Sequence, residues 1–202
     1  MSQTVKFWFD PACPFAWITS RWIREVEEVR DITVDFNVIS LGVLNESKDD
    51  PNNPETHKKW QGARAALAVR ERHGAEKVAD FYTAAGTRIH NNGYGLDDYE
   101  AALSEALEEI GVDDAAEILE ESQKETYDQG LRDSTKAALS LVGDDVGTPI
   151  IAIGDSAFFG PVMTRIPRGE QAGKIWDGFA ALVDFPYFYE LKRSRNTDID
   201  FS

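Results

Sequence analysis

The chain has 202 residues, a hydrophobic fraction of 42% and a formal net charge of −15. This length predicts one core fold that carries an insertion. The charge argues against nucleic acid and against an anionic membrane surface as partners, because binding either requires clustered Lys and Arg. No apolar run approaches a membrane span, and the N-terminal pattern predicts no secretory signal. The single cysteine cannot form an internal disulfide, which favours the reducing cytoplasm.

The first predicted elements are a strand, a helix and a second strand. Residues 5–9 form a short apolar and aromatic run, which is typical of a buried strand. Apolar residues then recur at three-to-four spacing over residues 15–30, which predicts a helix, and Pro14 suits its first position. Alternation over residues 32–41 predicts the second strand. A connection of helix length predicts that the two strands are parallel.

Residues 44–54 are polar and rich in turn-forming residues, which predicts a loop. The chain then shows helical periodicity without strand patterning as far as residue 140. The expected helices end at His73-Gly74 and at residues 91–93, and then cover residues 99–110, 115–120 and 122–140. We therefore expect residues 55–140 to form an all-helical insertion, a lid, in a domain made of residues 1–54 and 141–202.

The last third of the chain returns to strand patterns. Residues 150–153 and 157–159 predict two strands joined by a hairpin turn at Gly154-Asp155. Residues 170–183 predict a closing helix. The order β-α-β, helical block, β-β-α indicates an α/β fold with a central mixed sheet flanked by helices and a large helical insertion.

Cys13 lies where the first strand gives way to the first helix. Backbone N–H groups at a helix N-terminus favour negative charge, so this position predicts a stabilised thiolate, the nucleophilic form of cysteine. An inert buried cysteine is the alternative. Two features favour the reactive cysteine: Pro14 follows it, and Thr148-Pro149 precedes a late strand that this topology places beside the helix N-terminus. A cis bond at Pro149 would present the Thr148 backbone to a substrate, with an ordinary trans turn as the alternative.

Several separated stretches carry a resemblance that runs nearly end to end. They are residues 7–11, 13–14, 17–22, 44–46, 88–91, 145–149, 158–162 and 165–170. With them the chain resembles the DsbA family of thioredoxin-fold proteins, and within it the actinobacterial mycothiol-dependent nitroreductases of the cytoplasm. The resemblance implies a thioredoxin-like fold. It also implies an enzyme, a thiol-disulfide oxidoreductase that uses mycothiol as a low-molecular-weight thiol cosubstrate.

The resemblance also implies roles for individual residues. Cys13 is the catalytic nucleophile, and the motif and substrate groove comprise Pro14, Phe15, Ala16, Thr148 and Pro149. Asn45 and His90 are candidate ligand-binding residues, with a loop turn and a helix cap as their structural alternatives. Arg168, at a predicted helix start, is a candidate for binding an anionic group, with surface pairing as the alternative. One cysteine and three dispersed histidines predict no metal site.

The fourth position of the motif departs from the family. The family has Cys-Pro-aromatic-Cys, whereas this chain has Ala16 in place of the second cysteine. A mixed disulfide at Cys13 can then be resolved only by an outside thiol. Two explanations remain open: a natural monothiol enzyme, or an engineered change that traps a mixed disulfide.

Three functional hypotheses follow. The first is an oxidoreductase in which the Cys13 thiolate, reset by mycothiol, acts on small-molecule or protein disulfides or on electrophiles such as nitroaromatics. The second is an enzyme resembling glutathione S-transferase kappa or 2-hydroxychromene-2-carboxylate isomerase, which uses a bound thiol and could dispense with Cys13. The third is a binding module in which Cys13 has an ordinary pKa. The sequence leaves the physiological substrate and a homodimer open.

Overall fold

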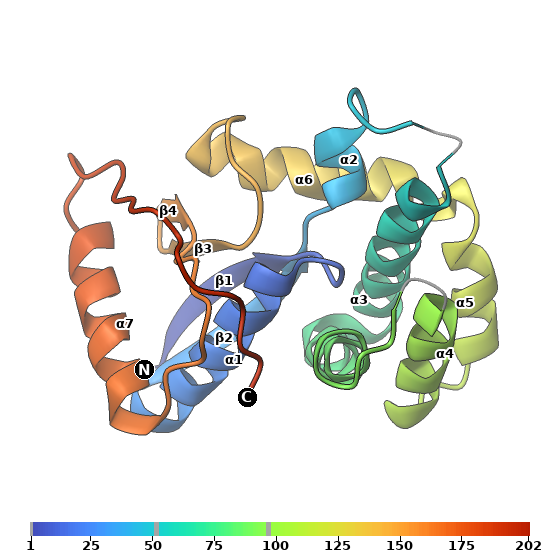
Figure 1. Ribbon diagram of the computed structural model, residues 1–202, viewed down its shortest axis with the longest axis horizontal. Coiled ribbons are helices and arrows are strands. Elements are labelled where there is room, and N and C mark those ends of the chain that lie inside the picture. The colour runs from blue at the N-terminus through green and yellow to red at the C-terminus, as the bar shows by residue number, and fades with distance from the viewer. Residues whose placement is uncertain (1, 51–52, 96–97) are drawn as a thin grey trace.

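A four-stranded mixed sheet forms the centre of the computed structural model, which describes residues 2–50, 53–95 and 98–202 (Figure 1). The strand order is β2-β1-β3-β4. The strands are β1 (Gln3–Phe9), β2 (Ile32–Val38), β3 (Ile150–Ile153) and β4 (Ser156–Phe159). β1 pairs in parallel with β2 and antiparallel with β3, and β3 pairs antiparallel with β4. The sheet confirms the parallel first unit and the two-residue hairpin at Gly154-Asp155.

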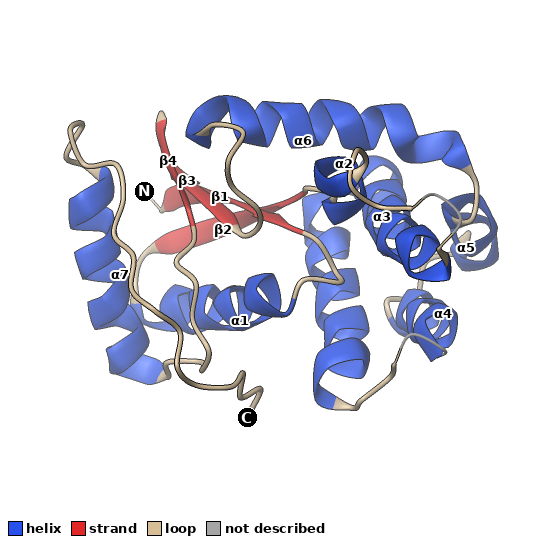
Figure 2. Ribbon diagram, turned by 45° about the horizontal axis from the view of Figure 1, so that its top comes forward, coloured by secondary structure: helices blue, strands red, loops and turns tan. Residues whose placement is uncertain are grey.

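Alternation along β1 gives the sheet two apolar faces. Phe7 and Phe9 belong to the larger buried cluster, whereas Trp8 points to the opposite face and packs with Ile150 and Ala138. Helix α6 (Asp128–Val142) covers this second face, while α1 (Pro14–Val29) and α7 (Gly169–Val183) cover the first (Figure 2). The layers confirm the predicted α/β fold with helices on both sides of a mixed sheet.

The second strand is shorter than predicted. It ends at Val38, and a short helix, α2 (Leu41–Asn45), takes up residues that we expected in the strand and in the loop after it. The reason is local: the Ser40 hydroxyl accepts the Val43 N–H at 3.3 Å, which caps a new helix. The apolar residues 39 and 41 extended the alternation beyond this cap.

The helical segment begins with α3 (Pro54–Gly86), which continues into a π-helical turn, η1 (Thr87–Asn91). Gly74 interrupts α3 with a φ of 87°, which confirms the helix end expected at this glycine. Helices α4 (Tyr99–Glu109) and α5 (Ala115–Ser122) pack on α3, as Figure 1 shows at the right. The helix expected over residues 122–140 starts later, because a 3-10 turn, η3 (Glu125–Tyr127), precedes α6.

After α7 the chain runs back across the molecule without regular structure. In Figures 1 and 2 residues 184–202 pass the β3-β4 hairpin and end beside α1. Within the described residues, no helix combines the length and the apolar character needed to cross a bilayer.

Candidate active site

Cys13 is the N-cap residue of α1, and its sulfur lies between two backbone groups. The Ala16 N–H donates to Sγ at 3.4 Å, and the thiol donates to the Thr148 carbonyl oxygen at 3.5 Å. The Thr148–Pro149 peptide bond is cis. The Thr148 hydroxyl donates to the Trp8 carbonyl at 3.2 Å, which fixes this loop to β1. The fold therefore brings the two ends of the predicted groove, Cys13 and Thr148-Pro149, into contact.

Burial dominates the ionisation of this thiol. Cys13 is 6% exposed, and desolvation raises the pKa of its thiol to about 11, although the Ala16 N–H acts in the opposite direction. The negative charge of Asp10 raises the same pKa further. The position of Cys13 at the helix N-terminus predicted a stabilised thiolate, whereas in this conformation the thiol of Cys13 stays protonated at neutral pH. The sequence shows the stabilising amide but not the desolvation, which comes from distant segments.

Asp10 links the cysteine turn to α2 from a fully buried position. One carboxylate oxygen accepts the Ala12 N–H at 2.8 Å, and the other accepts the Leu41 N–H at 2.7 Å. Desolvation nevertheless raises the pKa of Asp10 to about 7, against these two bonds and the positive charge of Lys59. Asp10 is therefore a positioning residue that holds the turn before Cys13 against the first residue of α2.

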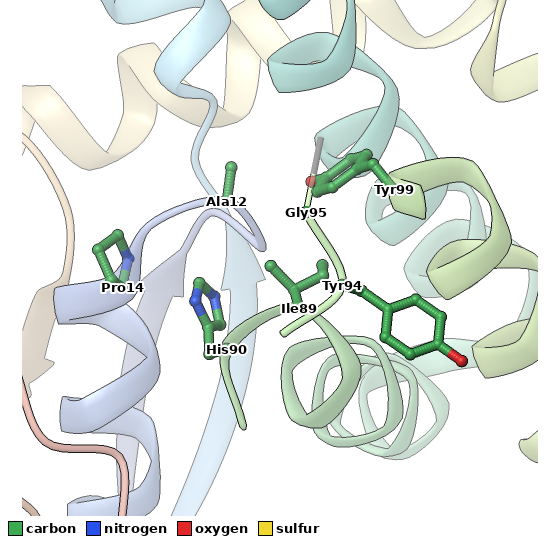
Figure 3. Close-up of a pocket in the computed structure, with 7 residues that line it drawn as sticks. All are labelled: Ala12, Pro14, Ile89, His90, Tyr94, Gly95 and Tyr99. Atoms are coloured by element: carbon green, nitrogen blue, oxygen red, sulfur yellow. The ribbon is translucent and has the colours of Figure 1, made fainter. Parts of the chain in front are cut away.

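A pocket of about 260 Å³ opens beside the cysteine turn (Figure 3). Its walls come from the turn and from the segment that joins α3 to α4: Ala12, Pro14, Ile89, His90, Tyr94, Gly95 and Tyr99. Ala12 and Pro14 are the two neighbours of Cys13 in the chain, so the pocket borders the cysteine turn, although Cys13 itself is not among its walls.

His90, from η1, forms one wall of the pocket as a neutral ring. Burial lowers the pKa of His90 to about 4, and its Nε2 lies 2.9 Å from the Pro11 carbonyl oxygen. A carbonyl only accepts, so Nε2 carries the proton and Nδ1 is left as an acceptor. The ring stacks on Trp17 at 5.7 Å between centroids.

The C-terminal segment, residues 194–202, covers the other side of the motif. The guanidinium of Arg195 lies 4.8 Å above the centre of the Phe15 ring, and the Phe201 ring packs on His90 with centroids 5.6 Å apart. Asn91 accepts the Trp17 indole N–H at 3.0 Å and donates to the Phe201 carbonyl at 2.8 Å. This segment thereby covers both the aromatic residue of the motif and a wall of the pocket.

The model of the Rv2466c-like family, described as mycothiol-dependent nitroreductase Rv2466c, matches residues 12–193. The chain belongs to the Rv2466c-like family. This membership confirms the resemblance inferred from the sequence, and it makes the chain a member of a thiol-dependent oxidoreductase family. Residues 194–202, which cover Phe15 and His90, lie outside the match.

Three further proteins are similar to this Rv2466c-like chain. Rv2286c of Mycobacterium tuberculosis is 29% identical over 195 residues, which is 96% of this chain and 83% of that protein. A solved 2-hydroxychromene-2-carboxylate isomerase shares the fold with a TM-score of 0.58 and 17% identity, over 88% of this chain and 93% of that one. The probable DsbA oxidoreductase SCO1869 of Streptomyces coelicolor has a TM-score of 0.57 and 14% identity, over 98% and 94% of the two chains. These structures confirm the thioredoxin-like fold.

The remaining candidates lie at different distances from the site. Asn45 closes α2 and donates to the Leu41 carbonyl at 2.8 Å, so it connects to the cysteine turn through the bond between Leu41 and Asp10. Arg168 lies elsewhere: its guanidinium bonds Glu25 at 2.9 Å, and Glu25 is about 18 Å along α1 from Cys13 at 1.5 Å per residue. The structure thus places Arg168 in a surface ion pair.

Four residues at the site were missed from the sequence: Asp10, Tyr99, Arg195 and Phe201. Asp10 had a usable signal, because an acidic residue that directly follows a buried strand requires partners. Tyr99 and the two C-terminal residues had none, since only the fold brings them to the pocket, to Phe15 and to His90. Among the described residues, no group of His, Cys, Asp and Glu could hold a metal ion.

Proposed function

We propose that this chain is a monothiol oxidoreductase in which Cys13 acts as nucleophile and mycothiol is the reductant. The observation that carries the proposal is the position of the Cys13 sulfur. It lies between the Ala16 N–H and the Thr148 carbonyl, beside a pocket bordered by its own two neighbours. The pocket is of a size for a small ligand, and the Nδ1 acceptor of His90 fits a polar group on a thiol.

The exchange reaction proceeds through a single mixed disulfide. The Cys13 thiol loses its proton to solvent, and the thiolate attacks one sulfur of a disulfide; the old S–S bond breaks and a thiolate leaves. A mycothiol thiolate then attacks the partner sulfur of this mixed disulfide: a new S–S bond forms between mycothiol and that sulfur, the bond to Cys13 breaks, and Cys13 leaves as a thiolate. With an electrophile such as a nitroaromatic, two mycothiol thiols supply two electrons and two protons: the nitro group becomes a nitroso group and releases one water, and mycothiol disulfide is the oxidised product.

The buried thiol must become hydrated before it reacts, because the pKa of about 11 keeps it protonated at neutral pH. The Ala16 N–H remains in place to stabilise the thiolate once water reaches it. Ala16 also means that Cys13 has no resolving partner within the chain, so the mixed disulfide persists until an external thiol arrives.

Mass spectrometry tests this proposal directly. After incubation with oxidised mycothiol, we expect one mycothiol adduct on Cys13, which free mycothiol removes. A Cys13→Ser control should carry no adduct. In an Ala16→Cys variant, the adduct should give way to an internal disulfide. Wild-type protein that forms no adduct at all would refute the proposal.

A second candidate function uses the same site without a nucleophilic cysteine. The fold shared with 2-hydroxychromene-2-carboxylate isomerase and the absence of a second motif cysteine favour an enzyme that activates a bound thiol. Cys13→Ser discriminates between the two. Full activity of this variant with added thiol would support the isomerase-like mechanism, and loss of activity would support the oxidoreductase.

A further inference from the structure

The hydroxyl of Tyr99 is buried without a hydrogen-bond partner. Tyr99 is 3% exposed, and its hydroxyl oxygen has no partner among the described residues. A buried hydroxyl that is left unsatisfied is unfavourable, so native structures seldom keep one without a use for it. The hydroxyl of Tyr82 is likewise without a partner among the described residues, but of these two tyrosines Tyr99 is the one that lines the pocket beside the cysteine turn, where a group from outside the chain can enter.

The position of this hydroxyl is set by the fold. Tyr99 is the first residue of α4, and in Figure 3 its ring extends toward the pocket with the oxygen on the side of Ala12 and Ile89. Gly62 of α3 leaves the space behind it: a Cβ atom there would lie 2.1 Å from the hydroxyl oxygen. The hydroxyl end of Tyr99 is thus held against the α3 backbone at Gly62, at the edge of the pocket that Tyr99 lines.

The other walls of the pocket offer this hydroxyl no partner. Pro14 and Ile89 present apolar side chains. The Tyr94 hydroxyl bonds Glu105 at 3.1 Å and points away from the pocket in Figure 3. The His90 Nε2 is taken by the Pro11 carbonyl. A ligand that enters this pocket meets ring faces and aliphatic groups, and its polar partners are the Nδ1 acceptor of His90 and the hydroxyl of Tyr99.

We propose that Tyr99 determines specificity in this pocket by donating a hydrogen bond to an oxygen acceptor on an aromatic ligand that reacts at Cys13. The inference rests on the proposed function, because the ligand must reach the Cys13 sulfur. The pocket volume of about 260 Å³ suits one substituted ring. A ligand without the acceptor leaves the hydroxyl unpaired and loses affinity.

Two maleimides that differ in one acceptor test the inference. N-(4-acetylphenyl)maleimide carries a ketone oxygen that N-phenylmaleimide lacks. Each reagent alkylates Cys13 by addition: the sulfur bonds to one alkene carbon, the other carbon takes up a proton, and nothing leaves. Because Cys13 is the sole cysteine, labelling reports on this site alone. The half-saturating concentration and the maximal rate are measured separately for each reagent.

In Tyr99→Phe we expect the half-saturating concentration of the acetyl reagent to rise about fivefold, with the phenyl reagent and both maximal rates unchanged. The melting temperature should not fall, because the hydroxyl makes no hydrogen bond to any residue that the structure describes. Tyr82→Phe is the matched control: Tyr82 is another buried tyrosine, on α3, and it is not among the pocket walls. It should leave both half-saturating concentrations unchanged.

Three outcomes would overturn the inference. The first is a Tyr99→Phe variant that binds both reagents as the wild type does. The second is a variant that weakens both equally with a lower melting temperature, which would assign the hydroxyl to folding. The third is wild-type Cys13 that neither reagent labels at any concentration. That result would refute the proposed function as well, whereas the first two leave it standing.

Discussion

Two segments border the Cys13 site, and they are attached to the rest of the molecule in different ways. The C-terminal half of α3 packs into the main core: the Tyr82 ring stacks on Phe9 of β1 with centroids 3.8 Å apart. Gly86 lies so close to α1 that a Cβ atom there would come within 2.3 Å of the Trp17 ring. This contact is apolar and buried, and it leaves no space for adjustment.

The C-terminal segment is held mainly by exposed polar contacts. The Thr164 and Thr197 hydroxyls bond at 2.9 Å, and Arg165 pairs with Asp200 at 3.2 Å. Exposed pairs of this kind contribute little to stability. Helix α3 is therefore a fixed wall of the site. Residues 194–202 form a cover whose contacts contribute little free energy.

The largest expected effect concerns Asp10, on the fixed side. Because burial raises the pKa of Asp10 from 3.8 to about 7, the folded protein keeps a proton that the unfolded chain has lost. The stability contributed by this group is therefore full below about pH 4 and is lost as the pH rises to about 7, by up to about 4 kcal/mol. In Asp10→Asn this pH-dependent loss should disappear. Urea unfolding of both proteins at pH 4 to 8 measures the difference, and parallel curves would contradict it.

Gly86→Ala tests the tight contact with α1. The added Cβ must displace the Trp17 ring, so we expect a loss of about 2–3 kcal/mol in the free energy of unfolding. Gly178→Ala is the matched control, since a Cβ there meets nothing within 4 Å in the middle of α7. The control should be neutral or stabilising by about 0.5–1 kcal/mol. Equal effects of the two variants on the free energy of unfolding would show that the Trp17 ring moves aside at little cost, which would contradict a fixed contact between α3 and α1.

Deletion of residues 194–202 tests the cover. The free energy of unfolding should change by less than about 1 kcal/mol, because the lost contacts are mostly exposed. Water then reaches Cys13, the pKa of its thiol falls, and alkylation by iodoacetamide at pH 8 should accelerate about tenfold. A pH profile of the alkylation rate gives the new pKa. An unchanged rate would mean that the cover does not limit access to the thiol.

Arg195→Gln should give the smallest effect. Arg195 places a cation above Phe15 in a chain of net charge −15, so it should favour anionic reagents at Cys13. Alkylation by iodoacetate relative to iodoacetamide should fall about twofold at low salt, and the difference should vanish at high salt. Arg193→Gln serves as the control. A ratio that falls equally in both variants would indicate a general loss of charge rather than a contact above Phe15.

The sequence predicted the elements that local patterns determine and missed those that tertiary packing determines. Strand β1 and helix α1 follow from the apolar spacing and from Pro14, and the interruption at Gly74 follows from the glycine. Strand β2 was predicted too long because apolar alternation continued past the Ser40 cap. The Cys13 position was predictable, but its raised pKa was not, since the desolvation comes from segments far along the chain.

The burial of Cys13 also determines how this protein survives oxidants. Because burial raises the pKa of its thiol to about 11, Cys13 is almost entirely protonated at pH 7. Peroxide attacks the thiolate, so the covered protein forms a sulfenic acid slowly. That protection is valuable here, because a chain with one cysteine has no second thiol to capture the sulfenic acid before irreversible oxidation. An exposed Cys13 therefore avoids irreversible oxidation only while a substrate or an external thiol is present to react with it.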